Sequence, residues 1–300
     1  MARDRNIEKL SDLHLQKLQG SLQELENRVI VEAAKLPKGG TLTLRTTAAL
    51  ELRPKLKQYI EETFLTTVQT NIEEYDQVAS WLVRDFKKFP IPAEFKQITE
   101  LDLTVIQQLK RASYIPYEDL ANEFVNTLDG QIYNSMLTGS SKEELISNLK
   151  GTINGVYQST DNEEASELID FINENPNSPQ KQSAIDRLHT IYGRDRLGNN
   201  LRRYANQIAQ DSIMSFDGLF AKYRADELGL KHYRYSGTSI RDSRPFCKKN
   251  VGKIFSEDQI KKIWGTTTWE GKAQGDPFAV RGGYNCRHNW QPVDPSWDLD

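Results

Sequence analysis

The stretch PKLKQYIEETFLTTVQTNIEEYDQVASWLVRDF at Pro54–Phe86 decides the class of the fold. Pro54 suits the first turn of a helix. Apolar residues then recur every three or four positions, a spacing that places them on one helical face. They are Leu56, Ile60, Phe64, Val68, Ile72, Tyr75, Val78, Leu82 and Phe86. We predict one long amphipathic helix of about nine turns at 3.6 residues per turn.

Helical patterns flank this segment on both sides. Residues 5–36 place leucine or valine at alternating spacings of three and four, which predicts a helix packed on a neighbour; these residues are Leu15, Leu18, Leu22, Leu25 and Val29. TLTLRTT at 41–47 alternates and predicts a short strand or an extended arm. Further helices are predicted near 99–113, 117–137, 141–150, 160–172 and 182–227, with breaks near Gly193 and at 198–200. SSKEE at Ser140–Glu144 matches a capping box.

The last seventy residues have a different pattern and contain both cysteines of the chain. Gly229 is predicted to cap a helix. KHYRYSG then has strand character, with Tyr233 and Tyr235 on one face. We predict a mainly α N-terminal region of long helices at residues 1–228, with a sub-break near 173–180. A small α+β C-terminal module is predicted at residues 229–300.

The composition of the chain argues against some classes of function. The chain of 300 residues carries a net charge of −3, which argues against a dedicated nucleic-acid binder. Residues 231–300 hold 12 Lys and Arg against 8 Asp and Glu, a mild excess that permits phosphate contacts. No run approaches the length of a membrane span, and the N-terminus lacks the apolar core of a signal peptide. We expect synthesis in a reducing cytoplasm, where two cysteines are thiols or ligands more often than a disulfide.

Common catalytic motifs are missing from the sequence. GTTTWEGKA at Gly265–Ala273 only mimics a phosphate-binding loop, because five residues separate its glycines and Ala follows its Lys. There is no HExxH motif and no G-x-S-x-G elbow. His14 and His189 lie in helical stretches and are predicted to be surface residues. His232 flanks the predicted strand.

Cys247, Cys286 and His288 form the remaining candidate site. Cys286 and His288 fall on the same side of an extended segment. Thiolate and imidazole suit zinc, which in structural sites takes four protein ligands. His232, Asp242 or Asp276 are candidates for the fourth. Two alternatives stay open: buried free thiols that pack as small apolar groups, and a disulfide.

Charged and aromatic residues surround these cysteines. Asp242, Arg244 and Arg287 are predicted to form bidentate ion pairs that hold loops together. The alternative is an anion site made by Arg244, Arg281 and Arg287. Trp264, Trp269, Trp290 and Trp297 are predicted to build the core of the small module.

At these residues the chain resembles the Mu F-like minor head proteins of tailed bacteriophages, also called the phage head morphogenesis family. The matching pieces are RDSRPFC at 241–247, GKIFSEDQIKKIW at 252–264 and GGYNCRH at 282–288. The helical stretch that precedes them is similar as well. The opening motif is shorter than the commoner family form, and Gly283 and Tyr284 stand where the family often has a histidine. A family-type cluster of Cys and His therefore carries over only to Cys247, Cys286 and His288.

The resemblance implies a non-enzymatic minor capsid protein in the virion head, near the portal. It would act in head assembly, DNA packaging or ejection after synthesis in the host cytoplasm. Expected partners are the portal protein and the major capsid or scaffold proteins, with several copies per virion and no membrane contact. Two alternatives stay open. One is a toxin-like enzyme that uses Asp242, Arg244, Cys247 and His288, and the other is an internal virion protein that contacts packaged DNA.

Overall fold

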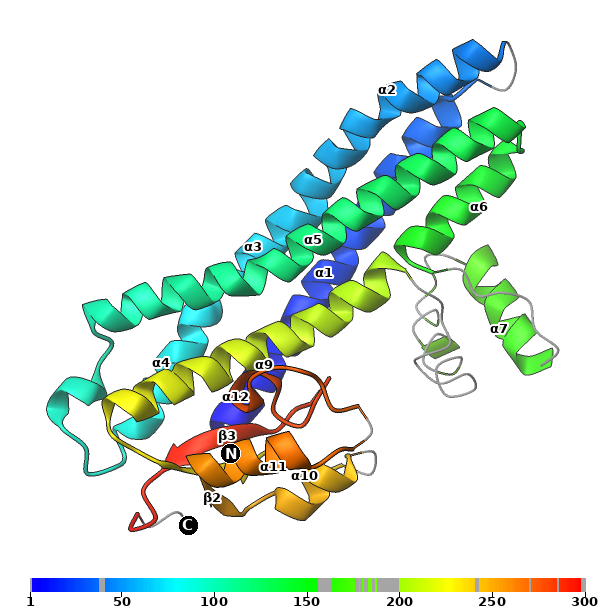
Figure 1. The fold of residues 1–300 in the computed structure, drawn as a ribbon. Helices are drawn as coiled ribbons and strands as arrows, with labels where there is room; N and C mark the ends of the chain where they lie inside the picture. Colours follow the sequence, from blue (N-terminus) through cyan, green and yellow to red (C-terminus); the bar gives the residue numbers. More distant parts are fainter. Residues whose placement is uncertain are drawn as a thin grey trace. The chain divides into compact units, whose positions relative to one another are not determined.

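The computed structural model describes residues 2–37, 41–155, 163–175, 178, 180, 183–184, 187, 200–240, 243–269, 271–284 and 286–297. In this part of the chain helices predominate, and a three-stranded antiparallel sheet lies near the C-terminus, as Figure 1 shows. This confirms the predicted fold class. The long helices are α1 (Ala2–Lys35), α2 (Leu42–Ile60), α3 (Thr66–Glu73), α4 (Tyr75–Phe86), α5 (Glu100–Thr138), α6 (Lys142–Ile153), α7 (Glu163–Glu174) and α9 (Leu201–Glu227). The C-terminal elements are β1 (His232–Ser236), α10 (Pro245–Asn250), β2 (Ile254–Ser256), α11 (Glu257–Thr266), α12 (Pro277–Val280) and β3 (Asn289–Val293).

The chain forms two compact units. Unit 1 contains Met1–Leu18, Leu65–Asp119 and Ala205–Asp300, and unit 2 contains Gln19–Phe64 and Leu120–Tyr204. Unit 1 therefore holds the whole sheet together with segments of the N-terminal helices. Whether residues 229–300 fold as a separate module stays a prediction.

The segment at Pro54–Phe86 is helical except at Glu74, a turn residue that separates α3 from α4, so the single long helix that was predicted is interrupted there. Every apolar residue of the predicted face is buried. The predicted start was wrong, because α2 begins at Leu42 and Pro54 lies inside it. The strand prediction for 41–47 was wrong for the same reason. The Thr41 side chain accepts a hydrogen bond from the backbone N–H of Leu44, an N-cap that starts a helix there.

A π-helical turn at Glu61–Leu65 joins α2 to α3. The buried positions between Leu56 and Ile72 recur every four residues. In an ideal α-helix, four residues advance about 40° beyond one turn, so such a row drifts around the helix. A wider π turn corrects this drift and keeps the row on one face.

Helix α1 confirms the predicted helix over 5–36, but its buried row passes through His14 and leaves Leu15 half-buried. His14 is 2% exposed, so the prediction of a surface residue was wrong. Its Nε2 lies 2.9 Å from a carboxylate oxygen of Glu74, and its backbone carbonyl accepts a hydrogen bond from Asn71. These contacts satisfy the polar groups of a histidine that occupies a core position.

The predicted break between 113 and 117 was also wrong, because α5 is one helix with Pro116 inside it. The predicted cap of α6 is present, since Ser141 accepts a hydrogen bond from the backbone N–H of Glu144. Helix α7 confirms the pattern at 160–172. Gly193 and His189 lie outside the described residues, as do residues 176, 177 and 179 of the predicted break at 173–180, and α7 continues through Glu174.

The C-terminal strands follow the predicted pattern. The N–H of Leu230 bonds to the carbonyl of Ala225, and Gly229 has φ +68°, which ends α9 as expected for a glycine cap. Strand β1 is central in the sheet order β2-β1-β3 and pairs antiparallel with both neighbours. Tyr233 and Tyr235 are buried, whereas His232 and Arg234 on the other face are half-buried, which confirms the predicted alternation.

The core of this part combines the two tyrosines with residues of α10, α11, α12 and the loop before β3. Trp264 and Trp290 are buried, and Trp269 and Trp297 pack against the core, as the sequence predicts. Trp269 donates its indole N–H to the carbonyl of Gly282, and Trp290 donates to that of Pro277. The indoles therefore fix the loop that carries Cys286.

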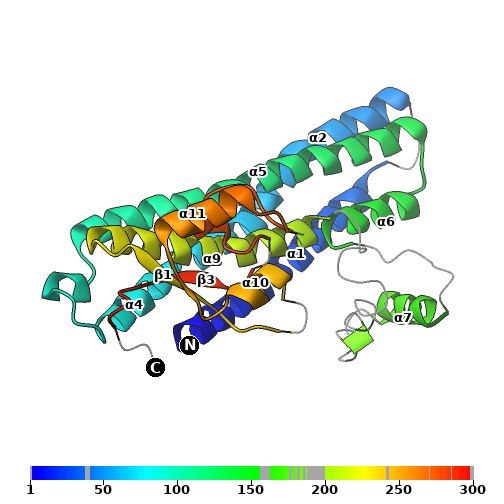
Figure 2. The same ribbon diagram turned by 60° about the horizontal axis from the view of Figure 1, so that its bottom comes forward.

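Ion pairs, among them one that is buried on both sides, join α9 to other segments of unit 1. Asp217 pairs with Arg3 of α1 and accepts a hydrogen bond of 2.7 Å from Asn289 of β3. Asp211 pairs with Arg281, which is 1% exposed. The sheet and α10–α12 lie beside α9 in both views (Figure 1 and Figure 2). Among the described residues, no helix combines the length and the apolar character that a bilayer crossing requires.

Candidate metal centre

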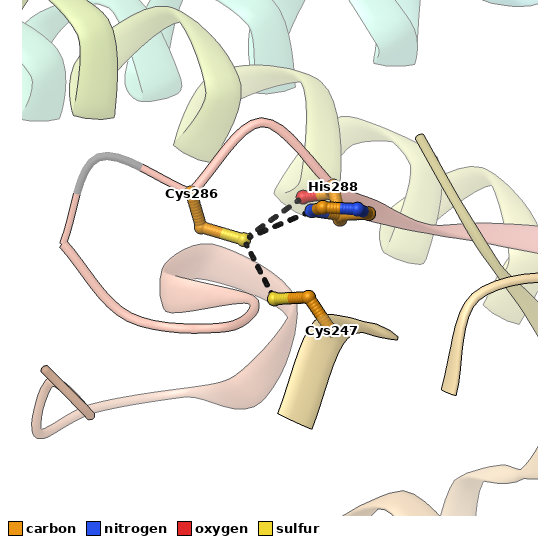
Figure 3. Close-up of side chains that lie close together, drawn as sticks. All are labelled: Cys247, Cys286 and His288. Carbon is orange, nitrogen blue, oxygen red and sulfur yellow. Dashed lines mark hydrogen bonds between the residues drawn. The ribbon is translucent and has the colours of Figure 1, made fainter. Parts of the chain in front are cut away.

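Two backbone segments, α10 and the loop before β3, bring Cys247, Cys286 and His288 together, as Figure 3 shows. Cys247 is the third residue of α10, which begins with Pro245 at its first position. Cys286 lies in the loop that leads to β3, and His288 directly precedes that strand. The opening and closing motifs singled out in the sequence therefore meet in space.

The donor atoms of these residues are close. The Sγ atoms of Cys247 and Cys286 lie 3.8 Å apart, and Cys286 Sγ lies 3.7 Å from Nδ1 of His288. All three donors lie within 4.8 Å of one another. The residues are 1%, 2% and 3% exposed, so the group is shielded from solvent.

Tyr235 is a fourth polar residue at this group, and the sequence did not point to it. Its hydroxyl lies 3.3 Å from Cys247 Sγ and 3.5 Å from Cys286 Sγ. Its ring stacks on that of His288, with centroids 5.4 Å apart and planes at 9°. The only indication in the sequence was the alternation of side chains along β1, which placed Tyr235 on the buried face of the strand.

Gly282 closes the group from the side of the loop. A Cβ atom at this position would lie 2.7 Å from both sulfur atoms and 2.7 Å from the Tyr235 hydroxyl. No side chain fits at such distances, so the backbone can approach the thiols only with glycine here. Arg281 before it has φ +56° and donates from Nε to the carbonyl of Cys286 at 3.3 Å. This contact holds the loop in its turn.

The two thiols have opposite pKa shifts. The hydrogen bond with Cys247 lowers the pKa of Cys286, and His288 and Arg281 lower it further. The same interaction with Cys286, together with burial, raises the pKa of Cys247. Burial also raises the pKa of Tyr235 well above its usual value. The surroundings therefore favour the thiolate of Cys286 over that of Cys247, and a cation bound in the group would favour loss of the remaining protons.

This donor set can hold a metal ion. Two sulfur atoms and an imidazole are the ligands that zinc prefers in structural sites. The Nε2 atom of His288 has no hydrogen-bond partner within the part of the chain that the structure describes. The nitrogen that faces the sulfur of Cys286 is Nδ1, at 3.7 Å, so Nδ1 is the atom of His288 that can bind an ion in this group.

Comparison with protein-family models, curated proteins and solved structures finds no match to this chain.

The other predicted site residues lie apart from the group or outside the described residues. His232 is on the opposite face of β1 from Tyr235, and Asp276 caps α12 by accepting from the N–H of Phe278. Asp242 lies outside the described residues, so its ion pairs stay a prediction. Arg244 donates to the carbonyl of Tyr284 at 2.6 Å, and Arg287 is exposed.

A cavity of about 320 Å³ lies in unit 1 on another side of the same loop. Its walls are mainly apolar and come from α5, α9 and the segments around α12. Arg281 and Gly283 line it as well. The loop thus separates the thiol group from a second, apolar space.

Proposed function

We propose that this chain is a non-enzymatic minor capsid protein of a tailed bacteriophage. It associates with the portal and the inside of the head and acts in head assembly, DNA packaging or ejection. The observation that supports this proposal best is the meeting of RDSRPFC and GGYNCRH at one buried group, because these motifs carry the resemblance to the phage head family. Its partners are the portal protein and the major capsid or scaffold proteins.

The burial of the group favours a structural role over the enzyme alternative. A catalytic cysteine must meet its substrate, and reactive cysteines lie in partly exposed surroundings. Cys247 and Cys286 are 1% and 2% exposed, and Gly282 covers them. A toxin-like Cys–His mechanism would require the loop at 281–286 to open first.

The test of the capsid proposal is quantitative mass spectrometry of purified proheads and mature heads from the phage that encodes the chain. We expect several copies per particle and crosslinks from this chain to the portal protein. Absence of the chain from both kinds of particle would refute the proposal. A portal-free prohead preparation serves as the control for the position near the portal.

We further propose that zinc is the ion held by Cys247, Cys286 and His288. Zinc at this point joins α10 to the loop before β3 and so fastens the two ends of the C-terminal segment. Elemental analysis of protein purified without chelator should give one zinc per chain. Cys286→Ser should lose the metal, whereas Ser239→Ala, a control at an exposed position, should keep it. Protein without zinc in all preparations would contradict the assignment.

A further inference from the structure

We propose that the phenol oxygen of Tyr235 is the fourth ligand of the ion held by Cys247, Cys286 and His288. This inference rests on the metal site proposed above. Tyr235 would be the fourth ligand, a position that neither His232 nor Asp276 can fill. With four protein ligands, no coordination position is open for water or substrate. The site is then closed, which is the mark of a structural metal centre.

The distances carry the assignment. Zinc binds sulfur at about 2.3 Å and nitrogen or oxygen at about 2.0–2.2 Å, so neighbouring donors of a tetrahedron lie about 3.3–3.8 Å apart. The two sulfur atoms lie 3.8 Å apart, and Cys286 Sγ lies 3.7 Å from His288 Nδ1. The Tyr235 oxygen lies 3.3 Å and 3.5 Å from the two sulfur atoms. These four separations match four of the six edges of such a tetrahedron, and the Cys247 and His288 donors lie within 4.8 Å of each other.

The surroundings orient the phenol toward the group. Tyr235 is fully buried on the central strand, and its ring stacks on His288. Both rings therefore present a donor atom to the same sulfur, that of Cys286. Gly282 covers the face formed by the two sulfur atoms and the phenol oxygen, since a Cβ there would lie 2.7 Å from each. No solvent ligand is needed to complete the site.

Two arginines lie near the site and can balance the negative charge that it would carry with zinc bound. A zinc ion with two thiolates, one phenolate and a neutral imidazole carries a single net negative charge. Arg281 is 1% exposed and donates from Nε to the carbonyl of Cys286, and Arg244 precedes α10 and donates to the carbonyl of Tyr284, so two guanidinium groups lie on the segments that carry the site. On zinc binding the phenol loses its proton to the buffer, and the O–H bond is replaced by an oxygen–zinc bond. The metal's own charge drives this loss despite the burial of the ring.

The experiment titrates zinc into the reduced, metal-free full chain at neutral pH and records the ultraviolet difference spectrum. Tyrosinate absorbs at a longer wavelength than tyrosine, so binding of zinc should produce the tyrosinate band in proportion to the bound metal. Tyr235→Phe should abolish the band and weaken zinc binding by more than about 100-fold, beyond the 10–100-fold typical of an outer-shell partner.

Tyr233→Phe is the matched control. Tyr233 lies on the same face of β1 and is also fully buried, and its hydroxyl has no hydrogen-bond partner among the described residues. This variant should keep both the tyrosinate band and the zinc affinity. Circular dichroism of both variants without metal distinguishes a folding defect from the loss of a ligand. The tyrosinate band of the wild-type chain is measured without any substitution, so it tests the assignment even if a variant does not fold.

The outcomes distinguish this inference from the proposal on which it rests. One equivalent of zinc bound without a tyrosinate band overturns the role of Tyr235 and leaves the three-ligand site intact. A wild-type chain that binds no zinc overturns both. The band in wild type and Tyr233→Phe, together with its loss in Tyr235→Phe, supports the assignment.

Discussion

The smallest residue of the site is the one with the least tolerance for change. Gly282 lets the backbone pass at contact distance from Cys247, Cys286 and Tyr235. We predict that Gly282→Ala lowers the free energy of unfolding by about 1–3 kcal/mol, the usual cost of inserting an atom into a packed site. Zinc affinity should fall as well, because the donors must move apart. Chemical denaturation and zinc titration measure both effects.

Gly265→Ala provides the control for this substitution. Gly265 lies in α11, and a Cβ there would meet nothing within 4 Å. Alanine favours the helix by about 0.5–1 kcal/mol over glycine, so this variant should be slightly more stable. Equal free energies of unfolding for the two variants would contradict the prediction, because the loop at Gly282 would then accept a Cβ without loss of stability.

His14 gives unit 1 a dependence on pH. Burial lowers its pKa below the usual 6.5, an effect that its contact with Glu74 opposes only in part and that Lys17 strengthens. The unfolded chain therefore takes up a proton at higher pH than the folded chain does. Stability should be complete above about pH 7 and should decline as pH falls through about 6.5.

Denaturation at a series of pH values tests this prediction. His14→Gln should remove part of the decline, because its side chain does not titrate in this range. Glu74→Gln keeps the ring and removes the partner that opposes the shift, so the decline should remain or steepen. An unchanged pH profile in His14→Gln would exclude this residue as the source.

At the scale of the element, α2 contains an exposed proline that a helix interior does not favour. Pro54 lies in the middle of Leu42–Ile60, where it removes one backbone hydrogen bond. We predict that Pro54→Ala stabilises the chain by up to about 3 kcal/mol. Pro277→Ala in the first turn of α12 is the control and should give no gain, since proline is favoured at that position. Urea denaturation compares the two.

The same element shows how far the sequence determines the fold. The row from Leu56 to Phe86 predicted a buried helical face because apolar spacing follows the helix period directly. Pro54 and Pro116 predicted helix ends where none occur, since packing of the flanking buried residues outweighs the local cost of proline. The alternation at 41–47 predicted a strand, but the cap at Thr41 decides in favour of a helix.

The sequence predicted three residues of the candidate site but not Tyr235 and Gly282, which complete it. Cysteine and histidine together are typical ligands of structural zinc, so the sequence alone identified Cys247, Cys286 and His288 as candidates. It did not identify Tyr235 and Gly282, because a tyrosine on a buried strand face is typical of a core and a glycine in a loop is typical of a turn. Their roles follow from the approach of β1 and the loop at 281–286, a tertiary contact without a sequence period.

At the scale of the whole molecule, residues 229–300 depend on partners earlier in the chain. Asn289 donates to Asp217, and Arg281 pairs with Asp211, both on α9. A fragment that starts at residue 229 lacks both carboxylates and the helix that carries them, so these contacts no longer stabilise the C-terminal segment. We therefore expect residues 201–300 to unfold at a higher temperature than residues 229–300.

Thermal unfolding of the two fragments, each with one equivalent of zinc, measures this difference. Asp211→Asn in the longer fragment should lower its melting temperature toward that of the shorter one. Equal melting temperatures would instead support an independent module with a boundary at residue 229.

The ion pair between Arg3 and Asp217 has a consequence for biosynthesis. Residues 1–18 and 205–300 belong to the same compact unit, so the first turns of α1 leave the ribosome long before their partners are made. Until then α1 has native contacts in that unit only with residues 65–119, such as those of His14 with Glu74 and Asn71, and contacts with the sequence separation of Arg3 and Asp217 form slowly. Unit 1 is therefore completed only after residues 205–300 have been made, and chains interrupted before residue 205 present a partly uncovered helix face to chaperones and proteases.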